Sequence, residues 1–114
     1  MKNAITIALL LTSLLSFGAK ADCVNDRNGN SVCGKGECAP DELGHFFCAD
    51  SGGGAMRDDL GNIQCGVGYC VHDYYSKVWC SKEPGGGATR DSSGKVKCLG
   101  GCEPGSKELC SEAR

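Results

Sequence analysis

The chain has 114 residues, and its 12 basic and 14 acidic residues give it a net charge of −2. The basic residues are scattered singly, so we expect no nucleic-acid partner, because binding to a phosphate backbone needs clustered lysine and arginine. Ten cysteines stand against only 18 large apolar residues beyond position 21. This balance excludes a large hydrophobic core and indicates a small protein stabilised by disulfides.

The first 21 residues have the form of a signal peptide. Lys2 gives a positive start, residues 4–15 are almost wholly apolar, and Ala19-Lys20-Ala21 has the small-x-small pattern of a cleavage site. Cleavage before Asp22 would remove two basic residues and no acidic ones, leaving a net charge of −4. The apolar run is too short for a membrane span, so we expect a secreted, extracellular protein, with the bacterial periplasm as the alternative.

The mature chain repeats a unit of about 32 residues. The cysteines set this period, because Cys33, Cys38 and Cys48 recur as Cys65, Cys70 and Cys80 and again as Cys98, Cys102 and Cys110. We therefore expect three tandem modules, at 22–51, 52–84 and 85–114, of which the last is a shortened cap.

Each module opens with Asp-x-x-Gly, at 26–29, 58–61 and 91–94. Aspartate can accept hydrogen bonds from the amides ahead of it, and glycine takes the left-handed conformation, so the motif predicts a tight hairpin turn with a glycine bulge. A Ca²⁺ loop is the alternative, but an EF-hand needs glycine at position six and a distal glutamate. The predicted fold class is small and disulfide-rich, with three tandem cysteine-stapled modules of short β-hairpins and little or no helix after the signal peptide.

Three cysteines in each module cannot all pair if every module has the same bonds. Cys23 lies where the later modules have Ala55 and Ala88, and it brings the total to ten. We therefore expect five disulfides, at least one of them between modules, while the spacing leaves the partners open.

Zinc is the alternative for the Cys-x4-Cys pairs at 33–38 and 65–70, but an exported chain favours disulfides, and we expect no metal and no cofactor. The two histidines, His45 and His72, fall at different positions of their modules. Because oxidised cysteine is no nucleophile either, we expect that the protein is not an enzyme.

The modules differ most between their second and third cysteines, and the candidate binding residues lie there. Phe47, Trp79 and Leu109 each precede the third cysteine of their module. If that cysteine points inward, its neighbour points outward, which would make an apolar stripe flanked by Tyr75 and His45. Such a stripe can stack on sugar rings or anchor a protein. The alternative is that these residues form the core.

Two further residues of these segments, Phe46 and Tyr74, fall on the cysteine face and are expected to be buried. Lys77 lies in the segment from Asp73 to Val78. In a stapled loop this lysine could enter a trypsin-like pocket, which gives the sequence a second functional interpretation as an inhibitor.

The run P-G-G-G-A-T-R-D at 84–91, the ending C-L-G-G-C-E-P at 98–104 and the cysteine spacing resemble the small secreted cysteine-rich, effector-like proteins of filamentous fungi. That class has no shared catalytic motif, so no site residues transfer from it. The resemblance implies a secreted, non-enzymatic binding protein, an extracellular effector or virulence-type protein that recognises a host protein or a cell-wall glycan. The alternatives are a secreted inhibitor of proteases or other hydrolases, and a toxin or antimicrobial protein, which the acidic charge disfavours on anionic membranes.

Overall fold

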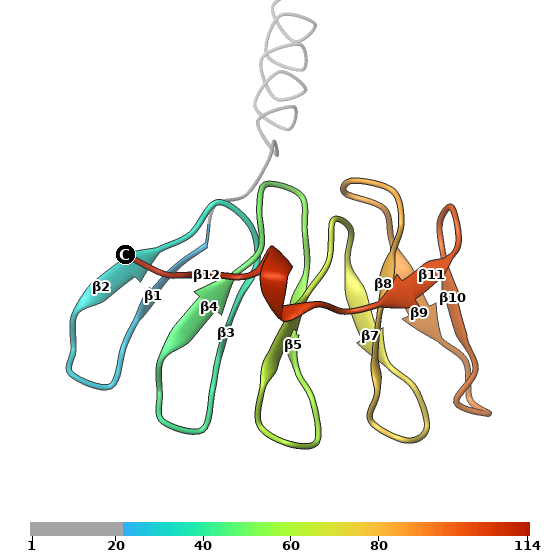
Figure 1. Ribbon diagram of the computed structural model, residues 1–114, viewed down its shortest axis with the longest axis horizontal. Helices are drawn as coiled ribbons and strands as arrows, with labels where there is room; N and C mark the ends of the chain where they lie inside the picture. Colours follow the sequence, from blue (N-terminus) through green and yellow to red (C-terminus); the bar gives the residue numbers. More distant parts are fainter. Residues whose placement is uncertain (1–21) are drawn as a thin grey trace, which may run out of the picture.

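The computed structural model describes residues 22–114, so the expected signal peptide lies outside the described residues. These residues form a flat row of five β-hairpins measuring 60 × 38 × 22 Å (Figure 1). The predicted fold class, a small disulfide-rich chain of short β-hairpins, is confirmed. Between residues 22 and 114 no helix has the length and apolar character needed to cross a membrane.

The hairpins are numbered in chain order and joined at one edge of the row by short glycine-containing connections. Their strands are β1 (Cys23–Asn25) and β2 (Ser31–Cys33) in hairpin 1, β3 (Cys38–Pro40) and β4 (Phe46–Cys48) in hairpin 2, β5 (Ala55–Arg57) and β6 (Ile63–Cys65) in hairpin 3, β7 (Cys70–His72) and β8 (Val78–Ser81) in hairpin 4, and β9 (Ala88–Arg90) and β10 (Val96–Cys98) in hairpin 5.

Residues 102–114 form a strap that runs back across the row, from hairpin 5 to hairpin 1 (Figure 1). It contains β11 (Cys102–Pro104), the 3-10 turn η1 (Lys107–Leu109) and β12 (Ser111–Glu112). β11 pairs with β8 and β12 with β4, while Ser106 and Arg114 exchange backbone hydrogen bonds with Cys65 and Cys33. The strap thus pairs with the second strand of hairpins 4, 3, 2 and 1 in turn.

The structural repeat is one hairpin, about half of the period that the cysteines show. Residues 22–51 hold hairpins 1 and 2, and residues 52–84 hold hairpins 3 and 4. Residues 85–114, the expected shortened cap, hold only hairpin 5 and the strap. The reason is local, because the segment from 102 to 110 has no Asp-x-x-Gly turn to reverse the chain.

The disulfides follow from the pairing within each hairpin. Three of them, Cys23–Cys33, Cys38–Cys48 and Cys70–Cys80, join residues that face each other in hairpins 1, 2 and 4. In hairpins 3 and 5 the facing residue is alanine, Ala55 or Ala88, so the cysteine is free to bond the strap. These last two bonds are Cys65–Cys110 and Cys98–Cys102.

The predicted count of five disulfides is therefore confirmed, and the bond from Cys65 to Cys110 joins the second module to the third. The four cysteines of the zinc alternative are all disulfide-bonded, which takes away its ligands.

Neighbouring hairpins pack through alternate side chains of their strands. The buried residues of hairpin 3 contact Ala39 and Phe47 of hairpin 2, and those of hairpin 4 contact Met56 of hairpin 3. One face of each inner hairpin therefore points to the preceding hairpin and the other to the following one. The buried residues are Ala55, Ile63 and Cys65 in hairpin 3, and Cys70, Val78 and Cys80 in hairpin 4.

We predict different effects for two Gly→Ala substitutions in the connections. A Cβ on Gly66 would lie 2.6 Å from Sγ of Cys80, whereas Gly87 has nothing within 4 Å. Gly66→Ala should lower the free energy of unfolding by about 2 kcal/mol, because the next hairpin must move. Gly87→Ala should change it by less than about 1 kcal/mol, in the stabilising direction. Urea unfolding of the oxidised mature protein measures both, and equal midpoints would contradict the close packing at Gly66.

The two disulfides of the strap should also differ in how much they contribute to the free energy of unfolding. Cys65–Cys110 closes a sequence separation of 45 residues and Cys98–Cys102 one of 4. From loop-closure entropy, the double alanine variant of the first pair should lose about 4 kcal/mol of stability and that of the second about 2 kcal/mol. Urea unfolding of both variants measures these two losses of stability. A larger loss on removing Cys98–Cys102 than on removing Cys65–Cys110 would be inconsistent with the strap as the long-range constraint.

Candidate functional site

The five hairpin turns lie along one edge of the row and share one hydrogen-bond pattern (Figure 1). In each turn an aspartate Oδ1 accepts hydrogen bonds of 2.8–3.0 Å from the backbone N–H groups two and four residues later. The fourth residue has a positive φ and is glycine in four turns and Ser76 in hairpin 4. The aspartates are Asp26, Asp41, Asp58, Asp73 and Asp91.

The predicted turn is therefore confirmed at its three expected positions, and the structure adds two more, at 41–44 and 73–76. Because all five hairpins end in the same aspartate-capped turn, their tips form one regular edge.

Three of the turns also contact the next one, in hairpins 1, 2 and 4. The side chain that follows the aspartate covers the glycine of the following turn, where an added Cβ would lie within 3.0 Å of it. This contact occurs three times, as Arg27 over Gly44, Glu42 over Gly61 and Tyr74 over Gly94. The position of each tip is thus set by its neighbours as well as by its own hydrogen bonds.

Four large apolar side chains project from this edge. Leu43, Leu60 and Tyr75 occupy the same turn position in hairpins 2, 3 and 4, and Tyr74 lies beside Tyr75. Their exposed fractions are 66, 76, 80 and 76% for Leu43, Leu60, Tyr75 and Tyr74. The two tyrosine rings meet edge to face with centroids 5.4 Å apart. We call these four residues the turn-edge row, because exposed apolar side chains gathered on ordered backbone are typical of an interaction surface.

Tyr74 was expected to be buried, and that expectation is wrong. The alternation of inward and outward side chains holds along β7 and β8, whereas Tyr74 lies in the turn between them and points into solvent. Phe46, in β4, is half-buried.

Three of the predicted binding residues lie away from the turn-edge row. Phe47 in β4 is half-buried against the core of hairpins 2 and 3. Trp79 in β8 is half-buried and donates a hydrogen bond of 2.9 Å from Nε1 to Oδ2 of Asp73. Leu109 lies in η1 of the strap and is 37% exposed. A binding role for these residues stays a prediction.

The other predicted residues lie in the turns of hairpins 2 and 4. Tyr75 belongs to the turn-edge row. His45 ends the turn of hairpin 2, with Nδ1 3.7 Å from Oδ2 of Asp41. Lys77, the candidate inhibitory residue, lies with Nζ 4.6 Å from the centroid of the Trp79 ring, so its ammonium group rests on its own hairpin.

Sequence reasoning missed Leu43, Leu60 and Tyr74 as site residues. The signal was present for the first two, because Leu60 lies in the recognised motif at 58–61 and Asp41-Glu42-Leu43-Gly44 repeats that motif within the first module. The turn of hairpin 4 ends in Ser76 instead of glycine, so a search for the motif passes over it.

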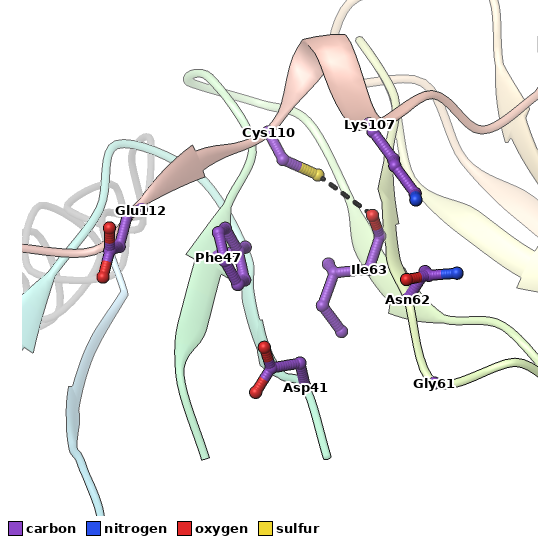
Figure 2. Close-up of a pocket in the computed structure, with 8 residues that line it drawn as sticks. All are labelled: Asp41, Phe47, Gly61, Asn62, Ile63, Lys107, Cys110 and Glu112. Atoms are coloured by element: carbon purple, nitrogen blue, oxygen red, sulfur yellow. Dashed lines mark hydrogen bonds between the residues drawn. The ribbon is translucent and has the colours of Figure 1, made fainter. Parts of the chain in front are cut away.

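A cavity of 310 Å³ lies between hairpins 2 and 3 beneath the strap. Figure 2 shows Phe47 and Ile63 on either side of it, the carboxylate of Asp41 below Phe47, Lys107 descending from the strap beside Ile63, and Glu112 of the strap on the far side of Phe47. Gly61, Asn62 and Cys110 complete its lining.

The second carboxylate oxygen of the turn aspartates has a different partner in different hairpins. Oδ2 of Asp73 accepts from Trp79, and this bond, with the backbone amides of Lys77 and Tyr75, lowers the pKa of Asp73 from its usual 3.8. For Asp58, burial raises the pKa, but hydrogen bonds from Gln64, Asn62 and Leu60 and the positive charge of Lys107 lower it overall. The turns of hairpins 3 and 4 therefore favour ionised aspartate.

No family model matches the chain, and neither a curated protein nor a solved structure matches it. In residues 22–114, no three or more histidine, cysteine, aspartate or glutamate side chains are grouped to hold a metal ion. The function must therefore be argued from the geometry of this chain.

We predict that Trp79→Phe raises the pKa of Asp73 towards 3.8 by removing its indole donor. A carboxyl whose pKa is lowered by folding stabilises the protein above its unfolded pKa, and this stabilisation is lost as the pH falls through the folded pKa. The variant should therefore lose less stability than the parent when the pH falls below about 4. Carboxyl NMR titration measures the shift. Asp91, whose pKa is lowered by Ser93, is the internal control and should not move.

Proposed function

We propose that the mature chain is a secreted, non-enzymatic binding protein that recognises an extracellular protein or glycan through the turn-edge row. The observation that carries this proposal is the exposure of Leu43, Leu60 and Tyr75 at equivalent positions of three neighbouring turns. A chain this poor in large apolar residues would gain stability by burying them. Their projection into solvent is explained by a partner that covers them.

The scaffold supports this proposal because it holds the row in place before binding. Each tip is fixed by two hydrogen bonds to an aspartate, three hairpins are closed by a disulfide of their own, and two further disulfides bond hairpins 3 and 5 to the strap. Binding therefore costs little conformational entropy in the protein. Five disulfides also indicate an oxidising compartment, in accord with the expected signal peptide. An effector-type role outside the cell, as in the fungal class that the sequence resembles, is part of the proposal.

The inhibitor alternative gains no support from the hairpin that carries Lys77. An inhibitory loop presents its primary side chain to the pocket of the enzyme, whereas the ammonium group of Lys77 is held over Trp79 by a cation–π contact. We therefore put forward the binding protein alone.

Paired variants test the turn-edge row. Leu60→Asn with Tyr75→Asn removes two of its exposed groups, and Tyr69→Asn with Leu99→Asn removes two exposed apolar groups elsewhere. The oxidised parent and both variants are passed over insoluble polysaccharides and over immobilised extracellular protein extracts. We expect parent and control to be retained on one of these materials and the row variant to bind it at least about tenfold more weakly, as for loss of a hot spot.

Near-ultraviolet circular dichroism confirms that each variant is folded. Equal retention of the row variant and the parent, or no retention of the parent on any material, would refute the proposed function.

A further inference from the structure

The cavity between hairpins 2 and 3 has an acidic group that its own hairpin leaves without a donor. In hairpins 3 and 4, the residue six positions after the turn aspartate donates to Oδ2, as Gln64 does to Asp58 and Trp79 does to Asp73. In hairpin 2 the equivalent residue is Phe47, which has no donor to offer. Oδ2 of Asp41 has His45 3.7 Å away, beyond hydrogen-bonding distance.

The rest of the lining suits a long side chain with a charged end. Phe47 and Ile63 form apolar walls, and Figure 2 shows the carboxylate of Asp41 below the Phe47 ring and that of Glu112 beyond it. Asp41 is half-buried, with 21% of its side chain exposed. The volume of 310 Å³ is at the small end of the range of ligand pockets, about 300–1,000 Å³. One side chain fits such a space better than an extended chain of sugars.

Lys107 is the one cation in the lining, and it lies at the other side of the cavity. Its charge already acts on Asp58. Burial raises the pKa of Asp58, but hydrogen bonds and the charge of Lys107 lower it overall. Two carboxylates, Asp41 and Glu112, remain on the Phe47 side. The excess of negative charge there favours a cation, and a guanidinium group offers carboxylates the planar set of donors that they bind best.

We propose that this cavity binds a basic side chain, arginine or lysine, of a protein partner, with its methylene groups against Phe47 and Ile63 and its charge on Asp41 and Glu112. The inference rests on the proposed function, and it selects a protein over a glycan as the partner. The turns that carry Leu43 and Leu60 also supply Asp41 and Asn62 to the cavity. A protein surface with a basic residue next to apolar ones would therefore engage the turn-edge row and the cavity together.

The test uses N-acetyl-arginine methylamide as the probe, titrated into the ¹⁵N-labelled, oxidised mature protein and followed by backbone amide shifts. We expect saturable shifts at Phe47, Gly61, Asn62 and Glu112. The matched probes are N-acetyl-glutamate methylamide and N-acetyl-norleucine methylamide, which carry the opposite charge or none. Both should bind at least about fivefold more weakly, because each lacks the charge-assisted hydrogen bonds.

Charge-neutralising variants assign the effect to the two carboxylates. Glu112→Gln and Asp41→Asn should each weaken arginine binding by about fivefold. Asparagine keeps an oxygen to accept the turn hydrogen bonds, and thermal unfolding checks that the turn is intact. Asp59→Asn, the same charge change at an exposed position outside the cavity, should leave the affinity unchanged.

Absence of saturable shifts at the cavity, equal binding of the norleucine or glutamate probe, or unchanged affinity in both Asp41→Asn and Glu112→Gln would each overturn the inference. These outcomes are independent of the retention assay on the turn-edge row. A parent that is retained through Leu60 and Tyr75 but does not bind arginine would keep the proposed function and lose only the basic side-chain pocket.

Discussion

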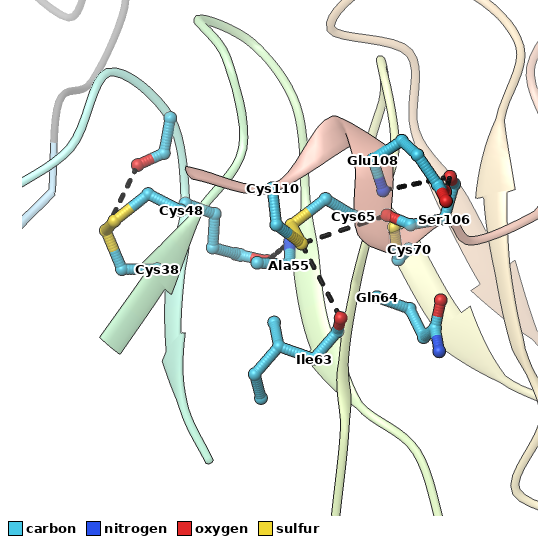
Figure 3. Close-up of a disulfide and its surroundings, with 12 residues drawn as sticks. Cys38, Cys48, Ala55, Ile63, Gln64, Cys65, Cys70, Ser106, Glu108 and Cys110 are labelled. Carbon is cyan, nitrogen blue, oxygen red and sulfur yellow. Dashed lines mark hydrogen bonds between the residues drawn. A yellow bond between two sulfur atoms is a disulfide. The ribbon is translucent and has the colours of Figure 1, made fainter. Parts of the chain in front are cut away.

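Each strand of the five hairpins spans only three or four residues, and an isolated two-stranded hairpin of this size is marginally stable in water. The strap removes this limitation, because its backbone pairs with the second strand of four hairpins and makes them parts of one unit. Its position depends on Cys110, which is bonded to the fully buried Cys65 at the centre of the row (Figure 3). The C-terminal strap is thereby tied to the middle of the row, whereas the local hairpins alone would form a string of independent units.

The side chains that face outward at the two ends explain why the row stops at five hairpins. Interior hairpins carry buried apolar groups on the faces that meet. The outer face of hairpin 1 instead has Asn25 and Ser31, whose side chains hydrogen-bond at 2.9 Å, and that of hairpin 5 has the exposed Thr89 and Lys97. Repeat arrays need such polar terminal faces to remain soluble. The proposed interaction surface therefore lies along the turn edge and not on the outer faces of hairpins 1 and 5.

The turn edge combines two properties that rarely occur together in loops. Its apolar side chains are exposed, yet the backbone that carries them is fixed by hydrogen bonds that its amides donate to each aspartate and by contact with a neighbouring turn. The same aspartates link the site to the scaffold. Asp73 uses both carboxylate oxygens within its hairpin, whereas the second oxygen of Asp41 is turned to the cavity beside Phe47. The two aspartates thus differ in one neighbouring residue. Trp79 donates to Asp73 in hairpin 4, whereas Phe47 has no donor for Asp41 in hairpin 2 and leaves its second oxygen free for a ligand.

The amino-acid sequence by itself determined the local structure. The Asp-x-x-Gly motif specifies a turn through contacts within five residues, and the odd number of cysteines in each module showed that at least one disulfide must join two modules. The five disulfides and the hairpin fold could be predicted for that reason. Counting this pattern only at the cysteine period missed the turns at 41 and 73, which carry Leu43 and Tyr74 of the turn-edge row.

Only the tertiary structure decided which side chains are exposed and what the last 13 residues do. Phe47 and Trp79 were candidates for an outward stripe, but their exposure depends on the neighbouring hairpin and on the strap, which approaches from residues 102–114. No spacing in the sequence encodes a strand that pairs across four hairpins, because those contacts join residues up to 81 positions apart, as from Cys33 to Arg114. The cavity arises in the same way, where Glu112 and Lys107 of the strap meet Asp41 and Ile63.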